Sequence, residues 1–323
     1  MPHAPEFWAK PGLAADLLAP LGWAHGALGA ARRGLTRPTR VAVPTICVGN
    51  LVAGGAGKTP VVLSLAKLLA DKGRRPHILS RGYGGSLRGP LRVDPARHTA
   101  REVGDEPLLL AAAAPAWICA DRIAAANAAI AAGADLLLLD DGFQNPALHY
   151  DLALVAIDGG YGIGNGRVIP AGPLREPVAR ALSRASAIVM IGACAQPLDL
   201  AGLPLLGAHL EAIGTDDLQG ARVVAFAGIG RPAKFFATLT ELGANIAEVR
   251  EFADHHPYSD AELADLAALA QANNATLVTT EKDWVRLPLA SHPSIRALKV
   301  ALRWDDPAAI ERLLAPVLAS AHG

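Results

Sequence analysis

The chain has 323 residues, with 30 acidic and 30 basic side chains, and 51% of its residues are hydrophobic. It can therefore bury a sizeable core, and extensive disorder is not expected. The balanced charge and the aromatic content of 5% argue against a nucleic-acid partner, which would require a basic surface or stacking aromatics. The three cysteines lie far apart, which argues against a disulfide framework or a structural zinc site and favours a reducing compartment.

The N-terminal segment 11–31 is apolar over about the length of a membrane span, but it contains Asp16, Pro20 and His25. A charged residue is costly within a span, and arginines cluster directly after the segment, at 32–40. A helix at the membrane surface fits better, because its apolar side chains would enter the lipid while the arginines meet anionic head groups. A helix packed on the protein fits equally well, so the residues alone leave both interpretations open. No cleavable signal peptide is apparent.

From residue 41 onward, short apolar runs alternate with longer helical stretches. This rhythm predicts an α/β fold, in which parallel strands are covered by helices on both faces. We expect a first lobe over 1–152, with a P-loop NTPase-like sheet and the N-terminal helix. A smaller lobe over 153–304 would close the active-site cleft, and a C-terminal helix over 305–323 could pack back on the first lobe.

A glycine-rich loop, GNLVAGGAGKTP, follows the first predicted strand and precedes a helix. It nearly matches the phosphate-binding pattern G-x-x-x-x-G-K-[ST], with Val52 where the first glycine would stand. The strand-to-helix context supports the motif, because glycine backbone N–H groups and a helix N-terminus together attract phosphate. The residues expected to hold the nucleotide are Gly54, Gly55, Ala56, Gly57, Lys58 and Thr59.

Two acidic residues, Asp140 and Asp141, end a later apolar strand. At this position a P-loop enzyme holds Mg²⁺, so we expect these residues and Thr59 to be the metal ligands. The guanine-reading pattern [NT]-K-x-D is not matched, because TEKD at 280–283 has its lysine one place late. ATP is therefore favoured over GTP.

A kinase also requires a residue that orients the acceptor hydroxyl and receives its proton. Asp105 stands at the head of a predicted helix, and His255 and His256 follow a strand of the second lobe. A histidine held by a carboxylate is a competent base near neutral pH. An aspartate at a helix start can equally be an N-cap, so both roles remain open for Asp105.

Eight motifs occur in order along the chain: GNLVAGGAGKTP, SRGYGG, GDEP, DDGFQ, PAGPLREP, AGIGRPAKFF, DHHPYS and TTEKD. Together they closely resemble the tetraacyldisaccharide 4'-kinases, from about residue 11 to residue 287. The loop of that family also lacks the first glycine, so the resemblance supports the interpretation of the loop as a phosphate site.

The resemblance implies that ATP phosphorylates the 4'-hydroxyl of an acylated glucosamine disaccharide 1-phosphate, giving lipid IVA in lipid A biosynthesis. It implies two α/β/α lobes joined by a short β linker, with the active site between them. It also implies a peripheral or monotopic protein at the cytoplasmic face of the inner membrane, which contacts the lipid surface through residues 11–40.

The residues carry over from the motifs one by one. The resemblance implies Asp105, His255, Asp140 and Asp141 as catalytic residues, with Lys58 and Thr59 on the nucleotide phosphates and Mg²⁺. Asp105 matches the base, with His255 as its partner from the second lobe, although the adjacent His256 leaves that choice open. Arg81, Arg175 and Glu176 are secondary candidates near the cleft.

Two other functions fit parts of the pattern. Another P-loop kinase or ligase, or a metal-delivery GTPase, would use the glycine loop without an N-terminal apolar helix. A membrane-associated nucleotide sensor would keep Lys58 and Asp140 but would have no use for Asp105.

Overall fold

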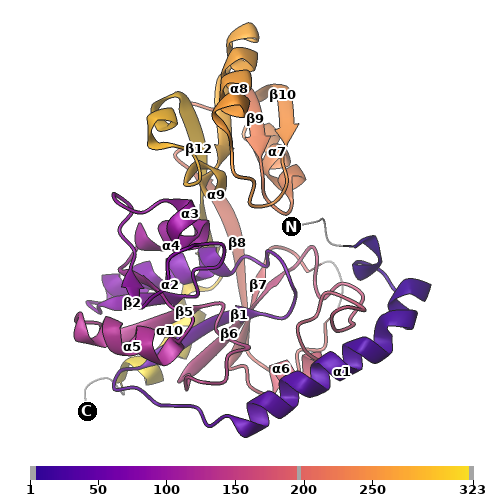
Figure 1. Cartoon of the computed structure of the whole chain (residues 1–323), viewed down its shortest axis with the longest axis vertical. Helices are drawn as coiled ribbons and strands as arrows, with labels where there is room; N and C mark the ends of the chain where they lie inside the picture. Colours follow the sequence, from indigo (N-terminus) through magenta and orange to yellow (C-terminus); the bar gives the residue numbers. More distant parts are fainter. Residues whose placement is uncertain (1–4, 195–197, 320–323) are drawn as a thin grey trace.

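The computed structural model describes residues 5–194 and 198–319, whose strands form a twelve-stranded, mostly parallel sheet (Figure 1). The strand order is β10-β9-β11-β12-β8-β7-β6-β1-β5-β2-β4-β3. Residues 1–4 and 320–323, which belong to the expected first lobe and C-terminal helix, lie outside the described residues. The mixed α/β class expected from the sequence is confirmed.

One half of the sheet is built around β1. Its strands are β1 (Thr45–Asn50), β2 (Pro76–Ser80), β3 (Leu91–Arg92), β4 (Ala116–Ile118), β5 (Leu136–Asp140), β6 (Leu152–Asp158) and β7 (Ala187–Ile191). All are parallel except β3, which pairs antiparallel with β4. Successive residues of β1 enter opposite cores, with Ile46 and Val48 on one face and Cys47 on the other. Burial on both faces explains why these strands are continuous apolar runs.

Helices cover both faces of this half. They are α2 (Lys58–Asp71), α3 (Ala100–Val103), α4 (Asp105–Ala111), α5 (Arg122–Ala131), α6 (Val178–Leu182) and α10 (Pro307–Ala319). One core contains apolar residues of α2, α4 and α10, and the other contains those of α5 and α6. The C-terminal helix thus returns to this half, where Ile310 and Leu314 are fully buried.

The other half is smaller and repeats the same layering. It contains β9 (Arg222–Ala227), α7 (Pro232–Glu241), β10 (Asn245–Glu251), α8 (Asp260–Ala272), β11 (Thr276–Thr280), α9 (Glu281–Trp284) and η2 (Leu289–Ser294). Phe235 and Leu239 of α7 pack on one face, and Leu263 and Leu266 of α8 pack on the other.

Two long strands, β8 (Leu205–Ile213) and β12 (Ile295–Trp304), join the halves. β12 pairs with β11 up to Leu298 and then runs antiparallel to β8 from Lys299 onward. The division expected at residue 152 falls between β5 and β6, yet both strands flank β1 in one continuous sheet. We therefore propose that the first lobe (β1–β7 with α1–α6 and α10) and the second lobe (β9–β11 with α7–α9) divide at the β8–β12 ribbon.

Helix α1 (Leu13–Leu35) lies along the outside of the first lobe, after the short η1 (Glu6–Trp8) (Figure 1). Its buried stripe consists of small residues, Ala15, Ala19, Gly22 and Gly26. A Cβ at Gly22 would lie 2.6 Å from the Val168 carbonyl oxygen, so glycine is required for this close approach. The helix is therefore seated by its small side chains.

The large apolar side chains of α1 point outward. Leu17 is 81% exposed and Trp23 is 72% exposed, and Leu21 and Leu28 are exposed beside them. Large apolar side chains exposed together on one helix are a feature of interaction surfaces. Among the helices in the described ranges, none combines the length and apolarity needed to cross a bilayer.

We predict opposite effects for two glycine-to-alanine changes in α1. Gly22→Ala should unseat the helix and cost about 1–3 kcal/mol, as overpacked sites do. Gly29→Ala, whose Cβ would meet only Arg33 Nη2 at 3.9 Å, should stabilise the helix by about 0.5–1 kcal/mol. Hydrogen exchange of the α1 amides measures both changes, and equal protection in the two variants would contradict the seating described here.

Candidate active site

The glycine loop connects β1 to α2, and the side chain of Asn50 fixes its first residues by hydrogen bonds. The buried Asn50 side chain donates from Nδ2 to the carbonyl oxygens of Val52 (2.7 Å) and Gly54 (3.3 Å). Val52 forms a β-bridge with Leu174, an extended arrangement that any residue adopts. The positive φ values occur later, at Gly54 (106°) and Gly57 (78°). The first glycine of the usual pattern is therefore not needed at residue 52.

Lys58 begins α2 and faces the acidic pair at the end of β5. Its Nζ lies 3.7 Å from Asp141 Oδ1, and Arg175 Nη1 donates to the same oxygen at 2.7 Å. Burial alone would raise the pKa of the Asp141 carboxyl, but the charges of Lys58 and Arg175 outweigh it and hold that pKa below its usual value. Asp141 is thus an ionised acceptor between two cations.

The pKa of Asp140 is shifted in the opposite direction from that of Asp141. It is buried, and its Oδ1 has no hydrogen-bond partner. Burial, with a further contribution from the charge of Glu106, raises the pKa of Asp140 to about 7. A buried oxygen without a partner at the end of a strand is the donor that a hard cation requires.

Mg²⁺ fits this donor set. Within the described ranges, no cluster of three or more His, Cys, Asp or Glu side chains could hold a metal alone. Mg²⁺ is usually bound by one or two carboxylates together with substrate phosphates and waters. Asp140 is therefore suited to hold a cation whose other ligands come from a nucleotide.

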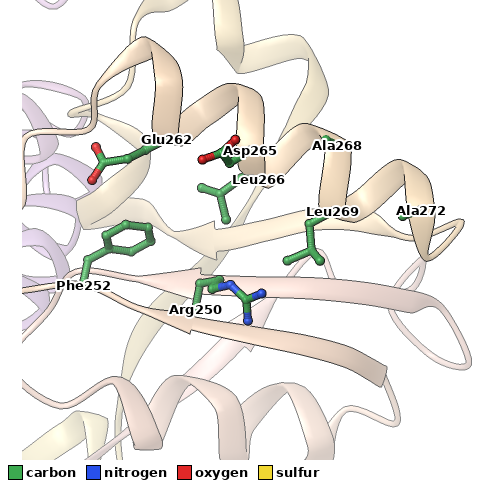
Figure 2. Close-up of a pocket in the computed structure, with 8 residues that line it drawn as sticks. All are labelled: Arg250, Phe252, Glu262, Asp265, Leu266, Ala268, Leu269 and Ala272. Atoms are coloured by element: carbon green, nitrogen blue, oxygen red, sulfur yellow. The ribbon is translucent and has the colours of Figure 1, made fainter.

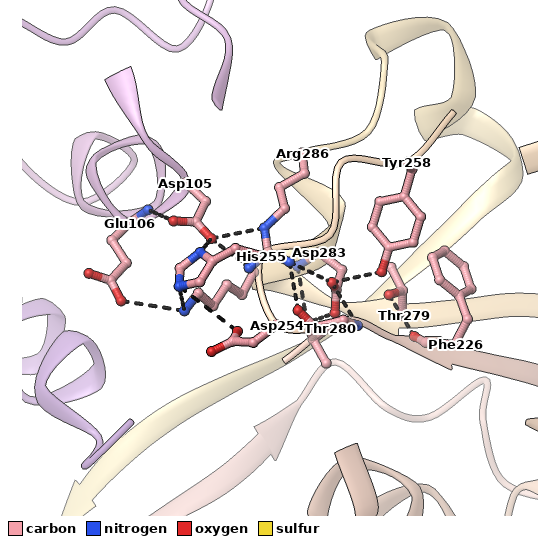
Figure 3. A network of polar contacts seen from close by, with 12 residues as sticks. Asp105, Glu106, Phe226, Asp254, His255, Tyr258, Thr279, Thr280, Asp283 and Arg286 are labelled. Carbon is pink, nitrogen blue, oxygen red and sulfur yellow. Dashed lines mark hydrogen bonds and ion pairs between the residues drawn. The ribbon is translucent and has the colours of Figure 1, made fainter. Parts of the chain in front are cut away.

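The two lobes meet at Asp105, which begins α4 (Figure 3). His255 Nδ1 donates to Asp105 Oδ2 at 2.9 Å, and Arg286 donates to the same oxygen from Nε (2.8 Å) and Nη2 (2.5 Å). The Glu106 backbone N–H donates to Asp105 Oδ1 at 2.9 Å. A carboxylate of the first lobe therefore accepts hydrogen bonds from two side chains of the second.

Burial would raise the pKa of the Asp105 carboxyl. The hydrogen bond from His255 and the charges of Lys282 and Arg286 reverse that effect and hold the pKa well below its usual range. Because Nδ1 of His255 donates to a carboxylate, Nε2 carries no proton in the neutral ring. Nε2 is thus the basic atom of the pair, and Lys282 Nζ lies 3.5 Å from it.

The two adjacent histidines face different partners. His255 has a positive φ of 61°, which turns its ring toward Asp105. His256 instead contacts Glu262 (Nε2 to Oε1, 2.9 Å) and stacks on Phe252 within the second lobe. The structure therefore places His255, and not His256, beside Asp105.

The TEKD segment has a structural role that the sequence did not suggest. Asp283 is fully buried and accepts hydrogen bonds from Tyr258 (2.8 Å) and Arg286 (2.9 Å), as well as from the backbone N–H of Gly228 (Figure 3). Its oxygens are occupied within the protein, so it is not placed to read a guanine base. It holds Arg286 in position for Asp105.

The secondary candidates have distinct positions. Arg175 contacts Asp141, as described above. Glu176 is buried and pairs with Arg33 and Arg184. It reaches the start of the glycine loop through Gln144, which donates to both Glu176 and the Asn50 carbonyl oxygen. Arg81 is exposed after β2, outside the network around Asp105.

Sequence reasoning missed Arg231, another residue of the second lobe that contacts the first. Its Nη2 donates to the carbonyl oxygen of Gly55 at 2.8 Å and lies 3.1 Å from Asp158 Oδ2. The motif AGIGRPAKFF was noted, but pattern alone did not show that it touches the glycine loop.

A groove of about 540 Å³ lies in the second lobe between α8 and β10 (Figure 2). Its lining residues are Arg250, Phe252, Glu262, Asp265, Leu266, Ala268, Leu269 and Ala272. None of the catalytic candidates lines it, and we assign it no part in the chemistry at the lobe junction.

We predict that Asp140→Asn stabilises the nucleotide-free, metal-free protein at pH 8 by on the order of 1–3 kcal/mol, because it removes a buried, unpaired charge. The pKa of Asp140 in the folded state, about 7, exceeds the unfolded value of about 3.9. The folded protein thus binds more protons, and this group's contribution to stability falls as pH rises through that interval.

Asp141→Asn is the matched control. The pKa of Asp141 is lowered in the folded state, so its carboxylate contributes stability above the ordinary Asp pKa, and that contribution is lost as pH falls. Its replacement should destabilise the protein at pH 8. Urea unfolding at pH 5 and pH 8 measures both variants, and a loss of stability with Asp140→Asn at pH 8 would contradict the assignment.

Comparison with known proteins places the whole chain in one group. The family model described as tetraacyldisaccharide-1-P 4'-kinase matches residues 14–319. A tetraacyldisaccharide 4'-kinase of Rhodospirillum centenum is 56% identical, over 98% of this chain and 96% of its own. One of Rhodospirillum rubrum is 49% identical, over 97% of each.

A solved structure supports the same grouping. The crystal structure of LpxK from Aquifex aeolicus in complex with ATP superposes with a TM-score of 0.79 at 28% identity, and the match covers 94% of this chain and 99% of that one. The resemblance seen in the eight motifs is therefore confirmed. The chain belongs to the tetraacyldisaccharide 4'-kinase family.

Proposed function

We propose that the protein transfers the γ-phosphoryl group of ATP to the 4'-hydroxyl of a tetraacylated glucosamine disaccharide 1-phosphate, forming lipid IVA in lipid A biosynthesis. The family match over residues 14–319 carries this proposal, and the ATP complex of the Aquifex aeolicus relative supports the choice of nucleotide. Another P-loop kinase or ligase, or a GTPase, is not favoured by that match.

The first lobe supplies the phosphate site in this proposal. Backbone N–H groups from Gly54 to Thr59 and the N-terminus of α2 would face the phosphates, and Lys58 would neutralise charge on the β- and γ-phosphates. Asp140 and the Thr59 hydroxyl would hold Mg²⁺, which offsets the negative charge that develops on the phosphate oxygens. Asp141 keeps Lys58 and Arg175 beside that charge.

The second lobe supplies the proton acceptor. The pKa of Asp105 is held low by His255, Lys282 and Arg286, so its side chain is a carboxylate. In this proposal that carboxylate orients His255 and stabilises the imidazolium that forms when Nε2 accepts the proton of the 4'-hydroxyl. The acceptor would therefore bind with its 4'-hydroxyl beside His255 Nε2.

Helix α1 provides the membrane contact. Its exposed leucines and Trp23 are suited to the acyl boundary, and arginines follow at 32–40. Such a helix would lie in the lipid surface without crossing it, at the cytoplasmic face of the inner membrane, where an acylated acceptor would be met. Residues 11–40 thus form the lipid-facing segment of the proposal.

The reaction is tested with purified protein, ATP, Mg²⁺ and tetraacyldisaccharide 1-phosphate in detergent, with mass spectrometry of the lipid. We expect a 4'-phosphorylated product from the wild type. Lys58→Ala should lose about 3 kcal/mol or more of transition-state stabilisation together with nucleotide affinity, whereas Asp105→Ala should lose rate with ATP affinity nearly intact. Equal loss of ATP binding in the two variants would contradict their separate roles.

Membrane contact is tested by flotation with vesicles that contain anionic lipid. Leu17→Ser/Leu21→Ser should bind vesicles more weakly, because two exposed leucines no longer enter the lipid. The matched control Leu205→Ser/Leu210→Ser changes two exposed leucines of β8, and its binding should match that of the wild type. Equal binding by all three proteins would exclude α1 as the contact.

A further inference from the structure

We propose that Arg33 of α1 is a positioning residue for phosphoryl transfer, acting through buried Glu176 on the Arg175–Asp141 pair beside the glycine loop. The inference rests on the proposed kinase function and concerns how the outer helix is connected to that site. It is carried by a continuous series of side-chain contacts from α1 to Lys58.

The series begins where α1 meets the body of the first lobe. Arg33 Nη2 lies 2.9 Å from Glu176 Oε2, and Arg184 Nη2 lies 2.9 Å from Glu176 Oε1. The Glu176 side chain is only 2% exposed, and that of Arg33 is 16% exposed. A carboxylate this deeply buried requires its cations, because water does not reach it. Arg33 is thus the contribution of α1 to balancing an internal charge.

Gln144 carries the contact onward to the glycine loop. Its Nε2 donates to Glu176 Oε1 (3.4 Å) and to the carbonyl oxygen of Asn50 (3.0 Å). Its Oε1 accepts from Arg175 Nη1 at 3.3 Å. One amide therefore touches the buried carboxylate, the end of β1 and the arginine that holds Asp141.

The last contacts reach the phosphate site. Arg175 Nη1 donates to Asp141 Oδ1 at 2.7 Å, and Lys58 Nζ lies 3.7 Å from the same oxygen. Arg175 and Glu176 are adjacent in sequence and share Gln144 as a partner. If Arg33 is removed, Glu176 loses one of its two cations, and Arg175 is a cation already joined to it through Gln144. Drawing Arg175 toward Glu176 would release Asp141 and change the position of Lys58.

In this arrangement, Lys58 and Asp141 are correctly placed only when α1 is packed on the first lobe. Arg32, the preceding residue, is exposed and leaves the helix about 100° around its axis from Arg33, so the effect should be specific to Arg33. Other contacts also keep α1 in register, among them the close approach at Gly22, the ion pair of Asp16 with Arg167 and the hydrogen bond from Arg180 Nη1 to the carbonyl oxygen of Gly26 (3.4 Å).

The test compares Arg33→Met, Arg32→Met and Arg33→Met/Glu176→Gln with the wild type, in neutral detergent micelles without anionic lipid. We expect Arg33→Met to lower kcat about tenfold to hundredfold, as misaligned reacting groups do, with little change in the KM for ATP. Arg32→Met removes the same charge from the helix surface and should change kcat by no more than about threefold. Thermal unfolding of each variant is followed in parallel.

The double variant separates positioning from simple loss of structure. Because Glu176→Gln removes the carboxylate that Arg33 balances, the double variant should regain most of the kcat lost by Arg33→Met. It also keeps the test usable if Arg33→Met alone does not fold. The proposal is overturned if Arg33→Met and Arg32→Met have equal kcat values, or if the double variant is no better than Arg33→Met. Absence of wild-type activity on the disaccharide would instead overturn the proposed function.

Discussion

A buried carboxylate, Asp105, joins the two lobes of the protein at the point where chemistry would occur. Placing it inside the protein is unfavourable unless its charge is met by hydrogen-bond donors and cations. The guanidinium of Arg286 and the Nδ1–H of His255 supply them, and both residues belong to the second lobe. The contact that joins the lobes at Asp105 therefore also orients the candidate base. The β8–β12 ribbon brings the lobes together, and Asp105 fixes how they meet.

The acidic residues of the site illustrate two ways of burying a negative charge. Asp105 and Asp141 are ionised because cations surround them, and both stabilise the fold. Asp140 has a raised pKa and an oxygen without a partner, so in the absence of a ligand it is a source of instability. Such a residue is suited to bind a cation. The free energy of metal–nucleotide binding would then offset the loss of stability that comes from burying Asp140. Glu176 is also a buried carboxylate that requires cations. Its ion pair with Arg33 and its hydrogen bond from Gln144 connect α1 to the glycine loop.

Much of the site could be predicted from the sequence, because its parts lie within short motifs. The glycine loop, Lys58 and the Asp140–Asp141 pair each follow a strand that is recognisable by its apolar run. The pairing of Asp105 with His255 depended on family resemblance, since 150 residues separate them. Nothing local distinguishes an aspartate that caps a helix from one that contacts another lobe.

The rest depended on three-dimensional packing that patterns do not encode. Arg286 and Asp283 are ordinary charged residues until the fold of the second lobe places them beside Asp105. The lobe division expected at residue 152 remains a prediction, and the one proposed at the β8–β12 ribbon follows from strand pairing, because β6 and β7 look the same in sequence whichever sheet they join. The sequence left open whether helix α1 packs on the protein or lies in the lipid surface, and in the structure its glycines and alanines face the protein, since close helix packing favours small residues. Hydrophobic periodicity identifies an apolar face without showing whether protein or lipid covers it.

The central claim is that Asp105 acts on the reaction through His255, across the lobe junction. A double-mutant cycle with Asp105→Asn, His255→Ala and the combined variant, measured as kcat/KM for the disaccharide acceptor, tests it most directly. If the two residues act as one unit, the second substitution should cost little once the first is present, giving an interaction energy on the order of 2 kcal/mol or more. Independent, additive losses would show that the two residues act separately and would contradict the account.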